Sequence, residues 1–219
     1  MTRLLPVLFA VLSATMLLLS AQMPPAPAGP AVSVPTFANS TCPIMGKKVS
    51  MPLFVDTELG RIYLCCKPCV RKVQADVPAA HKTAYPVVQD VANQVCPVSG
   101  NPIGEHRTSL VLQGFKLDLC CEGCIDAARK DAQVVLARVN APGLTNVGNQ
   151  TSPVDGKPVA PNAFAVVGDA IVRLSSPQQV TEVEKAPQAM LDKARAIRAK
   201  QPQPEPHRHA PKAAGKAER

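Results

Sequence analysis

The sequence contains no tryptophan, and aromatic residues make up only 3% of its 219 residues. Aromatic side chains supply much of the buried area in large hydrophobic cores. The chain also carries 23 prolines, which interrupt regular helices and strands. These features argue against one large core and favour several small units. Small units that bury little apolar surface are usually held together by disulfides or by a structural metal.

Signatures of catalysis and of nucleic-acid binding are also missing. No Ser-His-Asp order, pair of carboxylates or glycine-rich phosphate loop stands out, so we expect no enzyme. The net charge is +8, but +6 of it lies between Lys185 and Arg219, in nine basic and three acidic residues. No base-stacking aromatic pattern accompanies this segment, so we expect no nucleic-acid partner. Residues 201–219 are predicted to form a basic disordered tail.

The N-terminus predicts export. Arg3 precedes an apolar run from Leu4 to Leu19, and small residues follow. This pattern is typical of a signal peptide and is slightly short for a membrane span. We therefore predict residues 1–22 to be a signal peptide or N-terminal anchor, and residues 23–38 to be an extended Pro/Ala-rich linker. The expected location is periplasmic or extracellular, with a membrane contact only if the N-terminal segment stays uncleaved.

Three related segments follow one another along the chain. Their opening motifs are Cys-Pro-Ile-Met-Gly at 42–46, Cys-Pro-Val-Ser-Gly at 96–100 and Ser-Pro-Val-Asp-Gly at 152–156. The motifs start 54 and 56 residues apart, which predicts three copies of one module. We name them module one (residues 39–93), module two (residues 94–148) and module three (residues 149–200).

Each motif is followed by two short apolar runs around a glycine, namely Gly60, Gly114 or Gly168. This pattern predicts a β-hairpin, in which the glycine adopts a turn conformation that other residues resist. Apolar residues then recur at helical spacing, and the prolines at 68 and 177 suit a first helical turn. The predicted fold class is α+β, with three small modules that each contain a knuckle, a β-hairpin and a helix.

Eight cysteines occupy matching positions in the first two modules. They are Cys42, Cys65, Cys66 and Cys69 in module one, and Cys96, Cys120, Cys121 and Cys124 in module two. A hairpin returns the chain to its starting edge, so the thiols near the helix start can face the thiol of the knuckle. Three or four thiolates can surround one soft ion, such as zinc or copper(I). We therefore predict all eight as metal ligands, for about two ions per chain.

The helix start has a further expected effect. Its partial positive charge should lower the pKa of the thiols at Cys66, Cys69, Cys121 and Cys124, and the thiolate is the form that binds metal. Module three has Ser152, Ser175, Ser176 and Gln179 at the four cysteine positions. It is therefore predicted to be a degenerate module that keeps the fold and lacks the site.

Module one opens its cysteine pattern with Cys42, continues for about twenty residues and closes with Tyr-Leu-Cys-Cys-Lys-Pro-Cys at 63–69. This pattern resembles the TRASH and YHS group of metal-binding domains. The resemblance implies a compact treble-clef-like fold and a role in heavy-metal sensing, trafficking or resistance. It implies Cys42, Cys65 and Cys69 as ligands, and likewise Cys96, Cys120 and Cys124. Cys66 and Cys121 are then fourth ligands. Module three departs from the pattern and resembles the group only as a scaffold.

Two alternatives remain open. Cysteines of exported proteins normally form disulfides, although a bridge between the neighbours Cys65 and Cys66 would be strained. The Cys-x-x-Cys pairs suggest thiol redox catalysis, but no thioredoxin-like pattern surrounds them. We predict an exported soft-metal-binding protein for trafficking, buffering or resistance, with a metal transporter or other cell-envelope protein as a candidate partner. The alternative is a structural or interaction protein stapled by disulfides or by structural zinc.

Other residues near the motifs are weaker candidates. Met45, three residues after Cys42, is either a thioether ligand that favours copper(I) or a core filler, and Ser99 takes its place in module two. His81 is expected to be solvated and not to bind metal.

Overall fold

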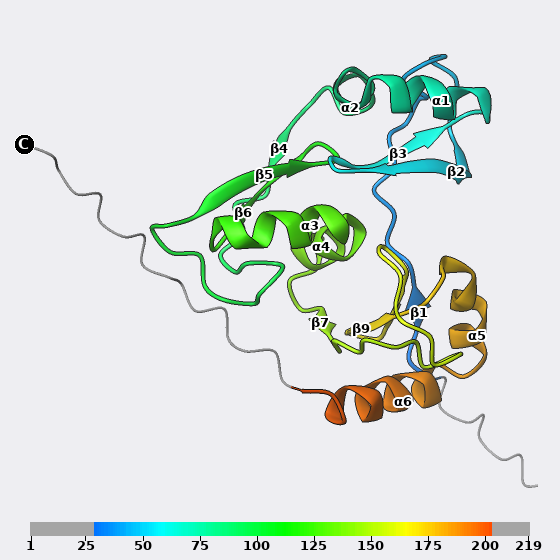
Figure 1. The fold of residues 1–219 in the computed structure, drawn as a ribbon, viewed down its shortest axis with the longest axis vertical. Coiled ribbons are helices and arrows are strands. Elements are labelled where there is room, and N and C mark those ends of the chain that lie inside the picture. The colour runs from blue at the N-terminus through cyan, green and yellow to red at the C-terminus, as the bar shows by residue number, and fades with distance from the viewer. Residues whose placement is uncertain (1–28, 203–219) are drawn as a thin grey trace, which may run out of the picture.

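A computed structural model describes residues 29–202, so the predicted signal peptide and nearly all of the basic tail lie outside the described residues. The described chain is α+β, as predicted, with six α-helices and three small sheets. The three modules are stacked in sequence order, with module one at the top of Figure 1 and module three at the bottom.

Module one contains the predicted hairpin and two helices. The elements are β2 (Ser50–Thr57), β3 (Gly60–Leu64), α1 (Pro68–Ala75) and α2 (Val77–Ala84). The strands pair antiparallel, and Gly60 at the turn has a φ of +101°. The core is formed by Ile62, Leu64 and Val73, which are fully buried.

Module two repeats this order and adds a strand. The added strand, β4 (Gln89–Asp90), lies at the end of module one, and module two itself contains β5 (Thr108–Leu112), β6 (Phe115–Leu119), a 3₁₀ turn (Glu122–Cys124), α3 (Ile125–Lys130) and α4 (Ala132–Asn140). β6 pairs antiparallel with β5 and parallel with β4. Leu112, Leu119 and Leu136 are fully buried, so α4 closes the core over the hairpin.

Module three has the largest sheet. Its elements are β8 (Phe164–Val167), β9 (Ala170–Arg173), a 3₁₀ turn (Pro177–Gln179), α5 (Val180–Lys185) and α6 (Pro187–Ala199), and β7 (Thr145–Asn146) at the end of module two joins its sheet. Strand order is β1-β8-β9-β7, where β1 (Val32–Ser33) comes from the predicted linker. Both faces of this sheet are covered, because Phe164 and Ile171 pack against Val134 of α4 while Val172 packs with Leu191 of α6.

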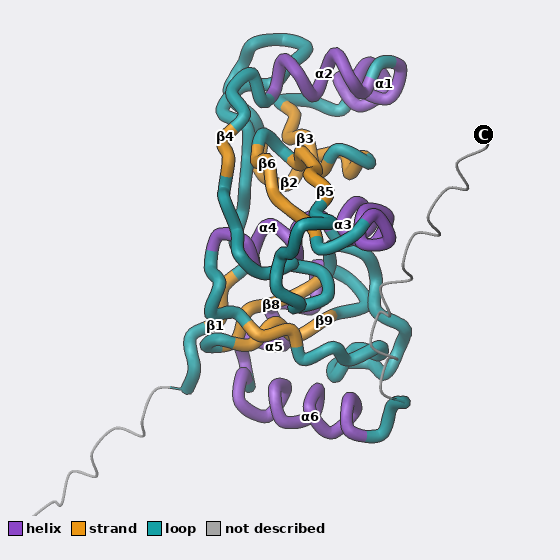
Figure 2. Tube along the Cα trace, turned by 90° about the vertical axis from the view of Figure 1, so that its left-hand side faces the viewer, coloured by secondary structure: helices purple, strands orange, loops and turns teal. Residues whose placement is uncertain are grey.

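Residues 30–38 run along all three modules. β1 pairs antiparallel with β8 of module three, and the chain then rises past module two towards module one (Figure 2). Phe37 contacts Phe115 of module two edge to face, with 5.9 Å between ring centroids. Its carbonyl accepts a hydrogen bond of 3.3 Å from the Tyr85 hydroxyl of module one. This part of the predicted linker therefore packs against the modules.

Modules one and two contact each other through a buried polar side chain. Gln113, at the β5–β6 turn, is only 1% exposed and has a φ of +48°. Its side chain accepts a hydrogen bond of 3.0 Å from the backbone N–H of Arg61 and donates one of 2.7 Å to the Phe37 carbonyl.

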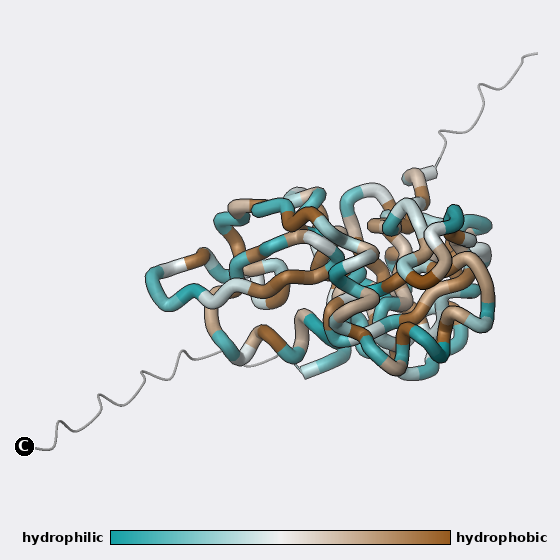
Figure 3. The backbone as a smooth tube through the Cα atoms, turned by 90° about the horizontal axis from the view of Figure 1, so that it is seen from above, coloured by the Kyte–Doolittle hydropathy of each residue, from teal (hydrophilic) through white to brown (hydrophobic). Residues whose placement is uncertain are grey.

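The hydrophobic stretches of the chain lie mainly inside the body, and many of the loops are hydrophilic (Figure 3).

Candidate metal centres

The first candidate centre is formed by the knuckle, the end of β3 and the start of α1. The sulfur atoms of Cys42, Cys65 and Cys69 all lie within 4.8 Å of one another. Cys42 and Cys69 are buried, and Cys65 is half-buried. The hairpin has returned the chain to the knuckle, as the sequence predicts.

The knuckle itself is closed by two backbone hydrogen bonds. The N–H of Cys42 donates to the carbonyl of Lys47 at 2.7 Å, and the N–H of Gly46 donates to the carbonyl of Cys42 at 2.8 Å. Gly46 has a φ of +65°, which only glycine adopts without strain. The same bonds are present at Cys96 and at Ser152, so the turn does not depend on the thiol.

An asparagine three residues before each knuckle position fixes it against the second strand of the hairpin. The side chain of Asn39 donates to the carbonyl of Tyr63 at 3.0 Å and accepts from the N–H of Tyr63 at 2.8 Å. Asn93 bonds to Asp118 in the same way, and Asn149 bonds to Arg173. These residues were missed from the sequence, although the shared Asn-x-x-Cys or Asn-x-x-Ser spacing carries the signal.

The second candidate centre has the same construction and is more enclosed. Cys96, Cys120 and Cys124 have sulfur atoms within 4.8 Å of one another, and all three residues are buried. The hydroxyl of Ser99 lies 3.2 Å from the sulfur of Cys120. The corresponding Met45 in module one is 50% exposed, so the core-filler interpretation of Met45 is wrong.

The remaining two thiols lie at the edge of each set of three. Cys66 is 3.7 Å from Cys65 and 3.3 Å from Cys69. In module two, Cys121 is 4.0 Å from Cys120 and 3.8 Å from Cys124. Both edge residues are half-buried. The structure thus groups the eight predicted ligands as two sets of four, each with three mutually close thiols around the knuckle and one at the rim.

The spacing of the sulfur atoms fits a soft metal ion. Four sulfurs placed tetrahedrally at about 2.3 Å from one zinc ion lie about 3.8 Å from each other. The sulfur distances from Cys65 and from Cys120 to the cysteine four residues later are 4.0 and 3.7 Å. All eight cysteines are free thiols. Neutral or anionic sulfur donors select soft ions over hard ones, and the donor set does not name a single metal.

Each knuckle thiol ionises more easily than an ordinary cysteine. Burial raises the pKa of Cys42, but hydrogen bonds from backbone N–H groups, led by that of Cys65, bring it down to about 7. Burial likewise raises the pKa of Cys96, and hydrogen bonds from the Ser99 side chain and from backbone N–H groups lower it to about 7. One thiolate per centre is therefore available near neutral pH.

The helix-start thiols behave differently from each other. Burial and hydrogen bonds with the neighbouring thiols raise the pKa of Cys69 to about 12, and burial together with the charge of Cys96 raises the pKa of Cys124. The prediction of lowered values is therefore wrong for these two residues, because burial outweighs the field of a short helix. A hydrogen bond from Cys69 lowers the pKa of the half-buried Cys66 thiol, in the predicted direction.

Module three replaces the thiols by a hydrogen-bonded set of oxygen and nitrogen atoms. The buried Ser152 hydroxyl donates to the side-chain carbonyl of Gln179 at 2.8 Å, which also accepts from the N–H of Ser175 at 3.1 Å. The Ser175 hydroxyl donates to Asp155 at 3.0 Å. The positions that correspond to the cysteines at 42, 65 and 69 of module one are thus joined by hydrogen bonds in module three.

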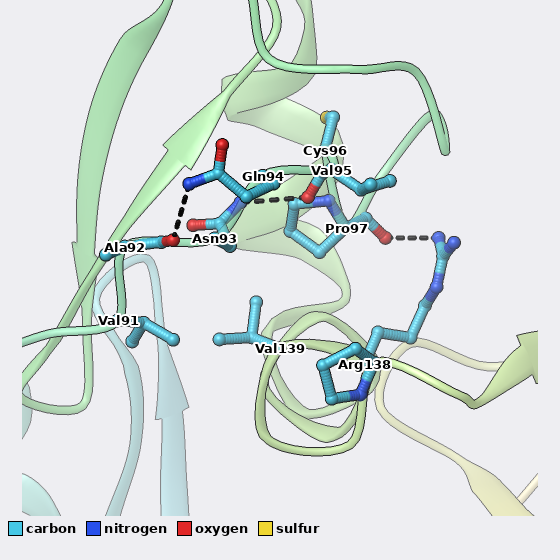
Figure 4. Close-up of a pocket in the computed structure, with 10 residues that line it drawn as sticks. Val91, Ala92, Asn93, Gln94, Val95, Cys96, Pro97, Arg138 and Val139 are labelled. Carbon is cyan, nitrogen blue, oxygen red and sulfur yellow. Dashed lines mark hydrogen bonds between the residues drawn. The ribbon is translucent and has the colours of Figure 1, made fainter.

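A pocket of about 360 Å³ lies beside the second centre, between residues 91–97 and the end of α4 (Figure 4). Arg138 reaches from α4 to the knuckle, where its guanidinium donates to the carbonyls of Pro97 and Val98. Cys96 contributes to the pocket wall. Helix α4, which module three covers on its other side, therefore positions the second knuckle.

Comparisons of the chain with protein-family models, with curated proteins and with solved structures give no match. No helix within residues 29–202 is long and apolar enough to cross a membrane.

His81 is 8% exposed and packs against Tyr85 with 5.1 Å between ring centroids, so the prediction that His81 is solvated is wrong.

Proposed function

We propose that this chain is an exported protein that binds two soft metal ions reversibly and serves in metal trafficking, buffering or resistance. The observation that carries the proposal is the presence of two separate sets of three thiols, each with sulfur atoms within 4.8 Å of one another. Thiols that act as simple nucleophiles must be exposed to their substrates, and most of these thiols are buried. Such thiols suit a soft metal ion, which prefers sulfur ligands to water.

The number of ions follows from the modules. Modules one and two each present one centre, whereas the corresponding side chains of module three hydrogen-bond to one another. Metal should be the cargo, because module three reaches the same hairpin and helix order without any thiol. A fold of this kind has no absolute need for a metal staple, which leaves the ions free to exchange.

The test is metal stoichiometry of the reduced chain without residues 1–22. The protein would be loaded with copper(I) or zinc under anaerobic conditions, desalted and measured by elemental analysis. Two ions are expected for the parent chain, one for Cys69→Ser and none for Cys69→Ser combined with Cys124→Ser. Ser175→Ala is the matched control and should keep two ions. No bound metal together with no free thiols in the native protein would contradict the proposal.

A structural role is the competing function, with the modules stapled by zinc or by disulfides. Exchange in the folded state separates the two functions. A carrier or buffer releases its ions to a chelator while its circular dichroism stays native, whereas a structural site releases metal only on unfolding. Three mutually close sulfurs at each centre favour metal over disulfides, because three sulfurs can surround one ion whereas a disulfide joins only two of them.

Family, location and partners belong to the same proposal. We propose that the cysteine-bearing modules are treble-clef-like members of the TRASH and YHS group, and the order of knuckle, hairpin and helix start with the last thiol supports this proposal. Export depends on residues 1–22, which lie outside the described residues. Fusion of residues 1–40 to a reporter that is active only outside the cytoplasm tests export, and the expected partner is a metal transporter or other cell-envelope protein.

A further inference from the structure

Each centre contains two overlapping sets of three sulfurs that share two members. In module one the inner set is Cys42, Cys65 and Cys69, all within 4.8 Å of one another. The outer set is Cys65, Cys66 and Cys69, with sulfur distances of 3.7, 3.3 and 4.0 Å. The two sets differ by one thiol, because Cys66 takes the place of Cys42.

Module two repeats the overlap. Its inner set is Cys96, Cys120 and Cys124, and Cys121 takes the place of Cys96 in the outer set. The outer sulfur distances are 4.0, 3.8 and 3.7 Å. An arrangement that recurs at two centres 54 residues apart is a property of the module and not of one local sequence.

The two sets differ in access to solvent. The knuckle thiols are closed off, with Cys42 at 1% and Cys96 at 0% exposure, whereas Cys66 and Cys121 are half-buried. Module three preserves the same division without sulfur. Ser152 at the knuckle position is fully buried, while Ser176 at the outer position is half-buried.

We propose that each centre is a two-position transfer device, in which a soft ion is stored in the inner set and handed over from the outer set to a partner that presents an exposed sulfur ligand. The inference rests on the proposed function. Cys66 and Cys121 are then the exchange ligands, and Cys42 and Cys96 are the storage ligands. Cys65, Cys69, Cys120 and Cys124 hold the ion in both positions.

The chemistry of the step is ligand exchange. The bond from the ion to the Cys66 sulfur forms, the bond to the Cys42 sulfur breaks, and the proton lost by the Cys66 thiol is taken up at the Cys42 thiolate. No electron is transferred. Soft ions accept three or four sulfur ligands, so the ion stays bound throughout. The partner's thiol then replaces the chain's sulfurs in the same manner, with one bond formed for each bond broken.

The experiment compares two reciprocal variants of the chain without residues 1–22, loaded with copper(I) under anaerobic conditions. Cys66→Ser with Cys121→Ser removes the outer sets and leaves the inner sets complete. Cys42→Ser with Cys96→Ser does the reverse. Transfer to the chelator bicinchoninate is followed by stopped-flow absorbance at several chelator concentrations, and bound copper is measured beforehand.

The variant that lacks the outer sets, Cys66→Ser with Cys121→Ser, is called the outer variant, and the reciprocal one is called the inner variant. The outer variant should retain two ions and transfer them at least about tenfold more slowly, which corresponds to an activation barrier higher by about 1.4 kcal/mol. The inner variant should bind more weakly and transfer faster than the parent chain. Transfer at the parent rate by the outer variant would overturn the inference while leaving the proposed function intact. Loss of copper from the outer variant would make Cys66 and Cys121 primary ligands and would also overturn it. Absence of copper from the parent chain would instead refute the proposed function.

Discussion

Ser152 donates a hydrogen bond of 2.8 Å to Gln179, at the two positions where module one carries Cys42 and Cys69. Ser152 is fully buried, and its hydroxyl also accepts from the N–H of Val154 at 3.2 Å. One side-chain hydrogen bond therefore spans the knuckle and the helix start that a metal would join in the other modules. This relationship explains how one backbone arrangement persists with and without thiols.

The first prediction is that restoring sulfur in module three creates a third centre. Ser152→Cys, Ser175→Cys and Gln179→Cys together should raise the bound copper(I) from two ions to three, because the backbone already holds these positions in the inner arrangement. Elemental analysis measures the change. The control is Gln179→Ala, which should add no ion and cost about 1–3 kcal/mol of stability, since it leaves the buried Ser152 hydroxyl without its acceptor. Two ions in a natively folded triple variant would refute the prediction.

The second prediction concerns the asparagine that holds each knuckle. Asn39→Ala leaves the buried N–H and carbonyl of Tyr63 without partners, and each costs about 1–3 kcal/mol. Urea unfolding should show the loss, and chelator competition should show weaker metal binding at module one. Asn149→Ala is the matched control in module three. It should lower stability similarly while both ions bind with unchanged affinity, and equal weakening of metal binding by both variants would argue against a local role.

The third prediction is a pH dependence of the metal-free, reduced protein. The pKa of Cys42 and of Cys96 is lowered from the ordinary 9.0 to about 7. A group whose folded pKa is lowered stabilises the fold at pH above its unfolded pKa, and that contribution is lost as pH falls through about 7. Thiolate absorbance in the ultraviolet should therefore rise by two thiolates per chain around pH 7. Cys42→Ser and Cys96→Ser should each remove half of this step, and a single rise near pH 9 would contradict the assignment.

The fourth prediction is that Gln113 links the first two modules. Gln113→Ala removes acceptor and donor groups that the Arg61 N–H and the Phe37 carbonyl now use in the interior. A loss of about 2–4 kcal/mol in the free energy of unfolding is expected, the range for breaking a buried hydrogen-bond network. Gln188→Ala on the exposed face of α6 is the control and should stay within about 0.5 kcal/mol. Equal effects of the two substitutions would show that the buried Gln113 contact contributes no more to the free energy of unfolding than an exposed side chain does.

Local patterns in the sequence predicted the elements that depend on local physics. The hairpins follow from alternating apolar runs around glycine, and Pro68 does lie in the first turn of α1, whereas Pro177 begins the 3₁₀ turn that precedes α5. The sequence also predicted that the cysteines of each module lie close together. A hairpin brings the end of its second strand back beside the start of its first strand, next to the knuckle. The second helices of modules one and two were missed. The start of α2 is marked by Asp76, whose side chain accepts from the N–H of Ala79 at 3.0 Å.

Contacts between distant segments could not be read from the sequence. Gln113 is a polar residue in a hairpin turn, and it is interior because it bonds to segments far away in the sequence, such as Arg61, 52 residues earlier, and Phe37, 76 residues earlier. His81 is buried because α2 packs over the hairpin, which no local pattern indicates. The pairing of β1 with β8 joins Val32 to Val167, 135 residues later, and no local pattern indicates that the linker packs in this way. The pKa values of Cys69 and Cys124 depend on the same three-dimensional burial.

The last prediction is that the two centres differ in metal preference at the position three residues after the knuckle cysteine. In module two the Ser99 hydroxyl lies 3.2 Å from the Cys120 sulfur, and in module three Asp155 contacts Ser175 at the matching place. This position therefore borders the second proposed ligand, and in module one it carries Met45, which is 50% exposed. A thioether is a soft uncharged donor that suits copper(I), whereas a hydroxyl adds nothing for a soft ion.

Each centre can be measured alone by removing the other with Cys124→Ser or with Cys69→Ser. Module one should then prefer copper(I) over zinc more strongly than module two in chelator competition. Met45→Ser should lower that preference about threefold to tenfold, equivalent to about 0.7–1.4 kcal/mol, and Ser99→Met should raise it in module two by a similar factor. Met45→Leu is the matched control, because it keeps the size and apolar character without the sulfur. If Met45→Leu behaves like the parent chain while Met45→Ser does not, the side chain acts by excluding water from the centre, and the thioether is not a ligand.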